Sequence, residues 1–169
     1  MIKSPFSGNN SNEVINMQLT QKESGLLKDL KDQERICIEK YKKHSSEACD
    51  PQLKNLFSQI AGVEQQHLDT LTQIENGSSP SPGSGSQSGQ GTQSFTPTYS
   101  SQESEEKKND CYLCSDVLST EKHASHLYDE CVFEFKDQSL RDTLNHIQKE
   151  EQGHGKMIYD YMAANGMYS

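Results

Sequence analysis

The segment Leu140-Arg-Asp-Thr-Leu-Asn-His-Ile-Gln-Lys-Glu-Glu-Gln-Gly-His154 already indicates the fold class. Its apolar residues recur at steps of three and four, which is the spacing of one face of an α-helix. On the same face, Glu151 and His154 occupy places where apolar residues would be expected. The segment therefore predicts an amphipathic helix whose buried face holds two ionisable side chains.

The same pattern occurs twice in the chain. The two blocks are residues 18–75 and 110–164, and a shift of 87 positions aligns matching residues of the first with the second without a gap. Each block has helical spacing in two consecutive segments and none of the alternation typical of strands. We therefore predict one helical hairpin present in two copies. The identical pairs include Glu34/Glu121, Tyr41/Tyr128, Asp50/Asp137, Leu53/Leu140, Ile60/Ile147, Glu64/Glu151, Gln65/Gln152 and His67/His154.

Local signals mark the ends of the predicted helices. Thr20-Gln-Lys-Glu23 has the residues of a capping box. Asp50-Pro51 provides an N-cap followed by the proline favoured at the first helical position, and Asp137 is an N-cap in the second block. Asn165-Gly166 predicts a helix end. Four helices of about 26 residues, each about 39 Å long, are expected.

The composition separates the two hairpins from the rest of the chain. Residues 76–109 contain ten Ser, five of the 11 Gly and three of the five Pro, but no Leu, Ile, Val or Met. Such a segment cannot bury enough apolar area to offset the entropy of ordering it. We therefore predict a flexible tail at 1–17, hairpin 1 at 18–75, a disordered linker at 76–109 and hairpin 2 at 110–169.

Length and charge limit the class of protein. The 169 residues favour a single domain, and the net charge of −9 argues against a nucleic-acid binder. No apolar run approaches the roughly 18 residues of a membrane span, and the first ten residues lack the apolar region of a secretory signal. The five Cys fit reduced thiols better than a disulfide framework. We expect synthesis in the cytoplasm and no membrane or nucleic-acid partner.

Six ionisable residues interrupt the apolar faces of the two blocks. An unpaired buried carboxylate would cost several kcal/mol, so four in one core require compensating positive charge. Two divalent cations would supply it. In each hairpin these residues lie equidistant from the predicted turn, near 50 and near 137, so they should meet at one level of a bundle. They are Glu34, Glu64, His67, Glu121, Glu151 and His154.

This set of residues has a known use in helical bundles. One Glu from each of two helices and a Glu-x-x-His motif from each of two others form the ligand set of ferritin-like di-iron carboxylate proteins. Oxygen and imidazole donors without thiolate favour iron or manganese, while zinc could bind adventitiously. Redox chemistry on peroxide or oxygen is the natural hypothesis for two such ions. The alternative is a bundle without metal in which the six groups satisfy one another.

Two further pairs of residues are candidates for a role. Tyr41 and Tyr128 lie two turns from Glu34 and Glu121 on the same faces. They either pack in the core or donate a hydrogen bond to a ligand on a neighbouring helix, or relay a radical. Cys111 and Cys114 are either a redox pair, half of an intermolecular metal clip, or ordinary packing residues, and a place at a helix N-terminus would lower their thiol pKa values.

The combined pattern resembles known families. The motifs Glu34…Tyr41, Glu64-x-x-His67, Glu121…Tyr128 and Glu151-x-x-His154 resemble the erythrin and rubrerythrin branch of the ferritin-like superfamily. Residues 110–168, with Leu118-Ser-Thr-Glu-Lys122 and Ile158-Tyr-Asp-Tyr-Met-Ala-Ala-Asn-Gly-Met-Tyr168, are similar to the spore coat protein F family of endospore-forming Firmicutes. This resemblance implies a location in the spore coat. Rubrerythrins have two Cys pairs that feed electrons to the metals, whereas Cys111-x-x-Cys114 is half of such a module. A peroxidase cycle would therefore need an external electron donor.

Together these observations predict an all-α protein, a ferritin-like antiparallel four-helix bundle of two repeated hairpins with a long crossover linker. The favoured function is that of a spore coat protein with two iron or manganese ions, an oxidoreductase of rubrerythrin or peroxidase type acting on peroxide or oxygen. The alternative is a structural coat component without catalytic activity. The expected partners are other spore coat proteins or a second copy of the chain, with exchange of hairpins between chains as a further arrangement.

Overall fold

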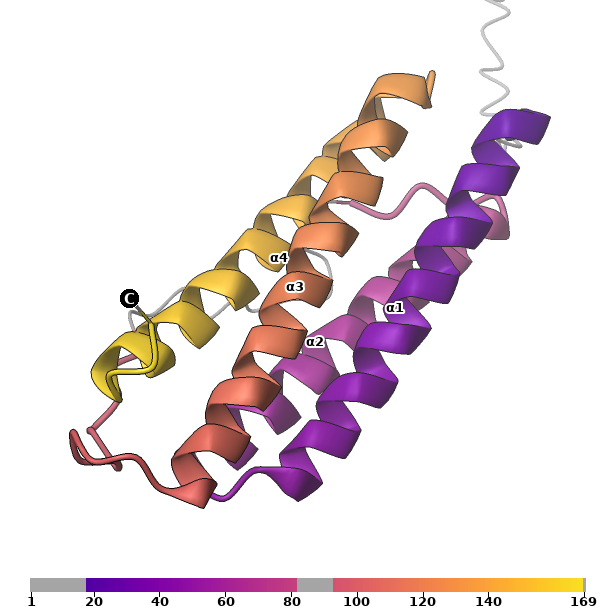
Figure 1. Ribbon diagram of the computed structural model, residues 1–169. Coiled ribbons are helices and arrows are strands. Elements are labelled where there is room, and N and C mark those ends of the chain that lie inside the picture. Colours follow the sequence, from indigo (N-terminus) through magenta and orange to yellow (C-terminus); the bar gives the residue numbers. More distant parts are fainter. Residues whose placement is uncertain (1–17, 82–92, 169) are drawn as a thin grey trace, which may run out of the picture.

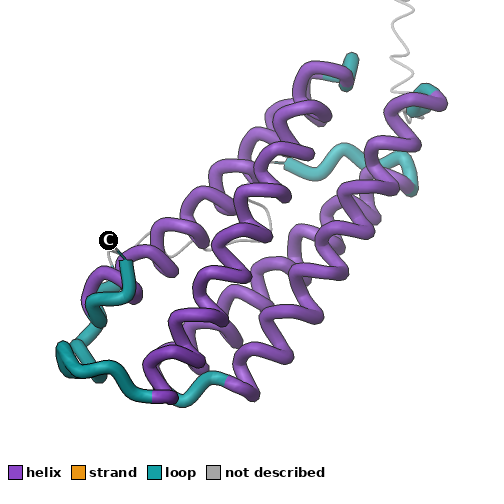
Figure 2. Tube along the Cα trace, viewed as in Figure 1, coloured by secondary structure: helices purple, strands orange, loops and turns teal. Residues whose placement is uncertain are grey.

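The computed structural model describes residues 18–81 and 93–168, which form four helices and no strand (Figure 2). The helices are α1 (Gln21–Glu47), α2 (Pro51–Glu75), α3 (Glu105–Glu134) and α4 (Gln138–Ala164). They pack side by side as a four-helix bundle (Figure 1), in which α1 pairs with α2 and α3 pairs with α4. The fold class and the two hairpins are as the periodicity predicts. The predicted N-terminal tail lies outside the described residues.

The predicted helix ends are confirmed by their hydrogen bonds. Thr20 and Glu23 form the reciprocal capping box at the start of α1. Asp50 caps α2, with Pro51 as the first helical residue, and Asp137 caps α4. Asn165 ends α4, and the following glycine adopts a positive φ of 61°. Side-chain acceptors for the first free N–H groups thus set the helix starts.

Helix α3 differs from the prediction, because it begins at Glu105 rather than at 110. Ser104 is its N-cap and accepts a hydrogen bond from the Lys107 backbone N–H at 3.1 Å. The first turn contains only polar residues, so it shows no apolar periodicity, although Glu105 and Glu106 suit the positive end of a helix dipole. The extra turn and a half lengthens α3 to 30 residues.

The segment between α2 and α3 runs from one end of the bundle to the other. Near its start, the Pro80 carbonyl accepts a hydrogen bond at 2.8 Å from Thr143, close to the beginning of α4. Near its end, the Thr98 backbone N–H donates at 2.8 Å to Asn165, at the end of α4. Helices α2 and α3 are therefore parallel, as a long crossover requires (Figure 1). Residues 93–104, within the predicted disordered linker, contact the bundle, and residues 82–92 lie outside the described residues.

An acidic side chain from each hairpin binds the turn of the other. Asp110, on α3, accepts hydrogen bonds from the backbone N–H groups of Cys49 and Asp50 at 2.8 and 2.9 Å. Glu23, on α1, accepts one from the backbone N–H of Lys136 at 2.8 Å. The repeat shift of 87 relates Asp110 to Glu23 and the two turns to each other. These reciprocal bonds align the hairpins along the bundle axis.

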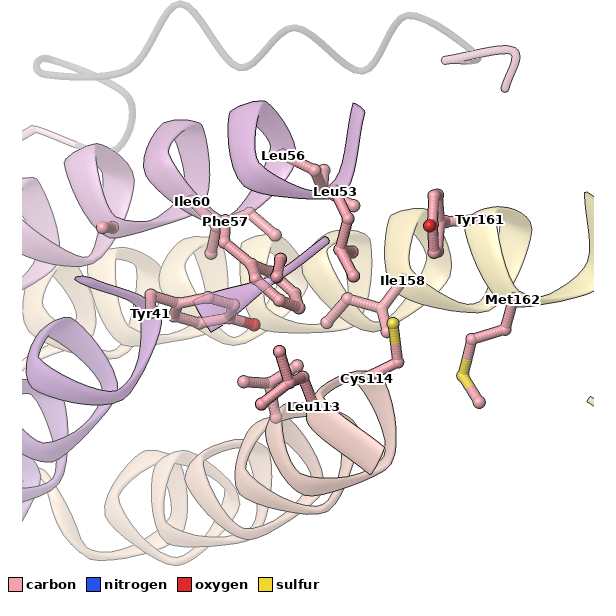
Figure 3. Packing of buried hydrophobic residues seen from close by; sticks show 13 residues of the cluster. Tyr41, Leu53, Leu56, Phe57, Ile60, Leu113, Cys114, Ile158, Tyr161 and Met162 are labelled. Carbon is pink, nitrogen blue, oxygen red and sulfur yellow. The ribbon is translucent and has the colours of Figure 1, made fainter. Parts of the chain in front are cut away.

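The apolar core consists of two clusters. One contains Tyr41, Phe57, Leu113 and Ile158 and lies toward the α1–α2 turn (Figure 3). The other lies toward the α3–α4 turn and contains Leu27, Leu30, Leu71, Ile74, Tyr128, Leu140, Leu144 and Ile147. On each helix, the ionisable residues predicted from the sequence fall between the two clusters. The charged level is therefore closed by apolar side chains at both ends.

Candidate metal centre

The structure brings the six predicted residues together at the middle of the bundle. Each helix contributes from its inward face: Glu34 from α1, the Glu64 and His67 pair from α2, Glu121 from α3, and the Glu151 and His154 pair from α4. None of the six is more than 3% exposed. The i, i+3 spacing of each Glu-x-x-His pair directs both side chains to the same side of one helix.

The donor atoms form two groups that share two carboxylates. Glu34, Glu64, His67 and Glu151 each offer an atom within 4.8 Å of the others, and so do Glu64, Glu121, Glu151 and His154. Glu64 and Glu151 belong to both groups, while each group has its own Glu and its own His. This division follows the internal repeat, because the shift of 87 converts one group into the other.

Both imidazole rings direct Nδ1 at the shared carboxylates. His67 Nδ1 lies 3.1 Å from Glu64 Oε2 and 2.9 Å from Glu151 Oε1. His154 Nδ1 lies 3.0 Å from Glu64 Oε1 and 4.0 Å from Glu151 Oε2. Each shared carboxylate therefore turns one oxygen toward each histidine. The two rings are stacked, with centroids 5.7 Å apart and planes inclined by 24°.

The two tyrosines contact the unshared carboxylates across the bundle. Tyr41 on α1 donates its hydroxyl proton to Glu121 Oε1 on α3, and Tyr128 on α3 donates to Glu34 Oε1 on α1. Burial, and then the adjacent carboxylate charge, raises the pKa of each tyrosine well above its ordinary value. Both hydroxyls therefore remain protonated donors. The sequence left open whether the tyrosines only pack in the core or donate a hydrogen bond to a ligand on a neighbouring helix, and the structure shows the hydrogen bond.

Burial and like charge perturb the carboxylates. Burial, and then the charge of Glu64, raises the pKa of Glu34 and of Glu151 well above the ordinary value. Burial alone would also raise the pKa of Glu64, but the charge of His154 and hydrogen bonds from both imidazoles lower it. Burial opposes protonation of His154, yet the charge of Glu64, the close contact with its carboxylate and the charge of Glu121 raise the pKa of His154 to about 10. Without metal, the site thus depends on protons for its positive charge.

Protons do not satisfy all the buried donor atoms. Among the described residues, Glu34 Oε2, Glu121 Oε2 and Glu151 Oε2 are buried without a hydrogen-bond partner. Buried polar atoms are rarely left unsatisfied in native proteins. These oxygens belong to three of the four predicted carboxylate ligands, and all three carboxylates are members of the two groups. The donor set therefore fits two divalent cations that accept oxygen and imidazole ligands.

Two residues near the centre are absent from the sequence prediction. Glu150 is buried, and its Oε2 lies 3.0 Å from His67 Nε2. Cys37 is fully buried on α1, one turn beyond Glu34, and burial, followed by the charges of the four carboxylates, raises the pKa of its thiol. Their repeat counterparts are Val63 and Ala124, so an alignment of the two blocks hides both residues. The one feature of the sequence that could have indicated Glu150 is its position directly before the predicted ligand Glu151.

Cys111 and Cys114 lie apart from the metal centre. Cys114 belongs to the apolar cluster near the α1–α2 turn, the partly buried Cys111 packs against that cluster, and both are free thiols. Because α3 begins at Glu105, the expectation that they lie at a helix N-terminus is wrong. Burial, followed by the charge of Asp110, raises rather than lowers the pKa of Cys114. Cys114 therefore lacks the environment that activates a thiol.

Comparison with known protein families gives a match over the C-terminal part of the chain. Residues 109–169 match the model of the Coat F domain, which covers most of α3 and all of α4. The match makes this part of the chain similar to a domain of spore coat proteins and indicates the spore coat as its location. No curated protein and no solved structure matches the chain. Within residues 18–81 and 93–168, no helix is both long enough and apolar enough to span a membrane.

Proposed function

We propose that this spore coat protein binds two iron or manganese ions in the core of a ferritin-like bundle. The observation that supports the proposal is the set of buried donor atoms in two groups that share Glu64 and Glu151, with three carboxylate oxygens left without a hydrogen-bond partner among the described residues. Two divalent cations would balance four carboxylates, and the two histidines would each serve one ion. When bound, such ions supply redox chemistry toward peroxide or oxygen.

The residues of the chain would perform three tasks around these ions. Glu64 and Glu151 would hold both ions, because each turns one oxygen toward either half of the site. Glu34 and Glu121 would each hold one ion and would be oriented by Tyr128 and Tyr41. The apolar clusters on either side would exclude bulk water and strengthen the electrostatic interactions.

Metal content tests the proposal directly. Full-length protein from cells supplemented with iron or manganese should contain about two ions per chain by elemental analysis. The double variant Glu64→Ala, Glu151→Ala should contain none, because it removes both shared ligands. Glu64→Gln with Glu151→Gln preserves side-chain size, and far-UV circular dichroism checks that the helices remain. Two ions retained in either variant would refute the proposed site.

A matched control uses acidic residues outside the core. Glu39 and Glu130 are exposed on α1 and α3, so the double variant Glu39→Ala, Glu130→Ala removes the same charge without touching the donor set. This control should keep both ions. Wild-type protein that is folded, heat-stable and metal-free after growth with both metals would show that the six polar groups satisfy one another.

One observation favours a second candidate, a structural coat component. All six ligands are at most 3% exposed, which suits a centre that stabilises the bundle. Optical spectra separate the two candidates. A metal-loaded protein whose spectrum responds to peroxide would support the oxidoreductase, which needs an external electron donor. Two bound ions without such a response would support the structural component, associated with other coat proteins or with itself.

A further inference from the structure

Glu150 breaks the symmetry of the candidate metal centre. It lies on α4 directly before Glu151, is only 7% exposed, and accepts a hydrogen bond from His67 Nε2 at 3.0 Å. Its other oxygen lies 3.6 Å from His146 Nε2. The repeat shift of 87 places Val63 at the corresponding position of α2, and a valine cannot accept such a bond.

The two histidines therefore have different surroundings. His67 uses Nδ1 toward the donor cluster and Nε2 toward Glu150. For His154, the carboxylate contacts within 4.0 Å in the described part of the chain all involve Nδ1. The remaining ligands are equivalent, since each group has the shared carboxylates and one Glu that accepts a tyrosine hydroxyl.

A carboxylate on the far nitrogen of a histidine has a defined effect. It keeps the proton on Nε2, so the lone pair is on Nδ1, where a metal can accept it. It also fixes the orientation of the ring and increases the basicity of the ligand nitrogen. Loss of such an outer partner typically lowers metal affinity by about 10–100-fold. Only the His67 half of the centre shows this arrangement in the described residues.

We propose that Glu150 is a positioning residue that makes the two ion positions unequal. The position formed with Glu34 and His67 fills first, and the position formed with Glu121 and His154 fills second. This inference rests on the proposed function, because it requires both ions to bind.

The test is calorimetric titration of the metal-free full chain with Mn²⁺ alone. Wild-type protein should show two binding steps. Glu121→Ala should retain the tight step, whereas the matched variant Glu34→Ala should lose it. Glu150→Gln, whose amide oxygen still accepts the hydrogen bond but lacks the charge, should weaken the tight step by about 10-fold or more and leave the other step unchanged.

Two further variants separate Glu150 from other sources of asymmetry. Val63→Glu introduces the missing carboxylate on the His154 side, and it should strengthen the weak step. Cys37→Ala installs the residue found at the repeat position, Ala124, and it should leave the order of filling unchanged. A reversal of filling order in this variant would assign the asymmetry to the thiol and overturn the inference.

The outcomes distinguish the inference from the proposed function. Two ions that bind wild-type protein with equal affinity would overturn the role of Glu150 and leave the metal centre intact. An equal loss in both steps with Glu150→Gln, together with a lower melting temperature, would show a structural role instead. A wild-type chain that binds no Mn²⁺ would refute the metal centre itself.

Discussion

Replacement of Tyr128 by Phe should destabilise the metal-free protein by about 1.5–3 kcal/mol, the range for hydrogen bonds to charged groups. The hydroxyl donates to Glu34 Oε1, and Glu34 Oε2 has no hydrogen-bond partner among the described residues. The variant therefore leaves a fully buried carboxylate without its donor, while the ring itself still fills its place. Burial, followed by the charge of Glu64, raises the pKa of Glu34, so this carboxylate can take up a proton when the tyrosine hydroxyl is lost. The expected loss of stability is therefore nearer the lower end of this range.

The assay is urea unfolding of chelator-treated protein at neutral pH, followed by circular dichroism. For a chain of this length the cost corresponds to a fall of about 3–12 °C in melting temperature. Tyr41→Phe should cost a similar amount, because Tyr41 makes the equivalent bond to Glu121. Tyr159→Phe is the control. Because Tyr159 is 44% exposed, removal of its hydroxyl should lower the free energy of unfolding by less than about 0.5 kcal/mol. A Tyr128→Phe variant as stable as this control would refute the reasoning.

Three further predictions concern ions, the hairpin turn and acid. Mn²⁺ at about 100 times its dissociation constant should add about 2.7 kcal/mol per site to the stability of metal-free protein, and a chelator should reverse the gain; bound ions without a shift in melting temperature would contradict this. Asp110→Ala should cost about 3–5 kcal/mol in urea unfolding, because it leaves the backbone N–H groups of Cys49 and Asp50 without their acceptor, and a cost below about 1 kcal/mol would contradict it. The pKa of Asp116 is lowered: partial burial would raise it, but hydrogen bonds from Lys40 and His44 outweigh burial. The stabilising contribution of Asp116 is therefore present above the ordinary Asp pKa and is lost as the pH falls through the lowered pKa. Asp116→Asn should flatten this part of the acid unfolding curve, and an unchanged curve would contradict the assignment.

The elements that were predictable have causes close by in the sequence. Apolar spacing indicates the four helices, and the residues Thr20, Asp50 and Asp137 mark three of the four starts because each caps with its own side chain. The start of α3 was not predictable from periodicity, since its first turn is polar throughout. The disordered linker was predicted from composition, which does not record the hydrogen bonds that residues 93–104 make to α2 and α4.

The candidate site also contains residues that the sequence predicted and residues that it did not. The repeat alone identified the six residues that the structure brings together, because charged residues on an apolar face need a common partner. The same repeat concealed Glu150, since its counterpart is Val63 and its role depends on the distance to a ring on another helix. The expectation that Cys111 and Cys114 lie at a helix N-terminus was wrong, because α3 begins about one and a half turns before Cys111.

The sequence by itself determined four amphipathic helices, their duplication as two hairpins, and the level at which six ionisable residues meet. These follow from periodicity and capping, which act over a few residues. The tertiary structure alone decided which carboxylates are shared, which tyrosine serves which glutamate, and which histidine has a second carboxylate. It also decided how Asp110 and Glu23 align the two hairpins. Those contacts join helices that are distant along the chain, so they depend on how the hairpins pack and leave no local pattern.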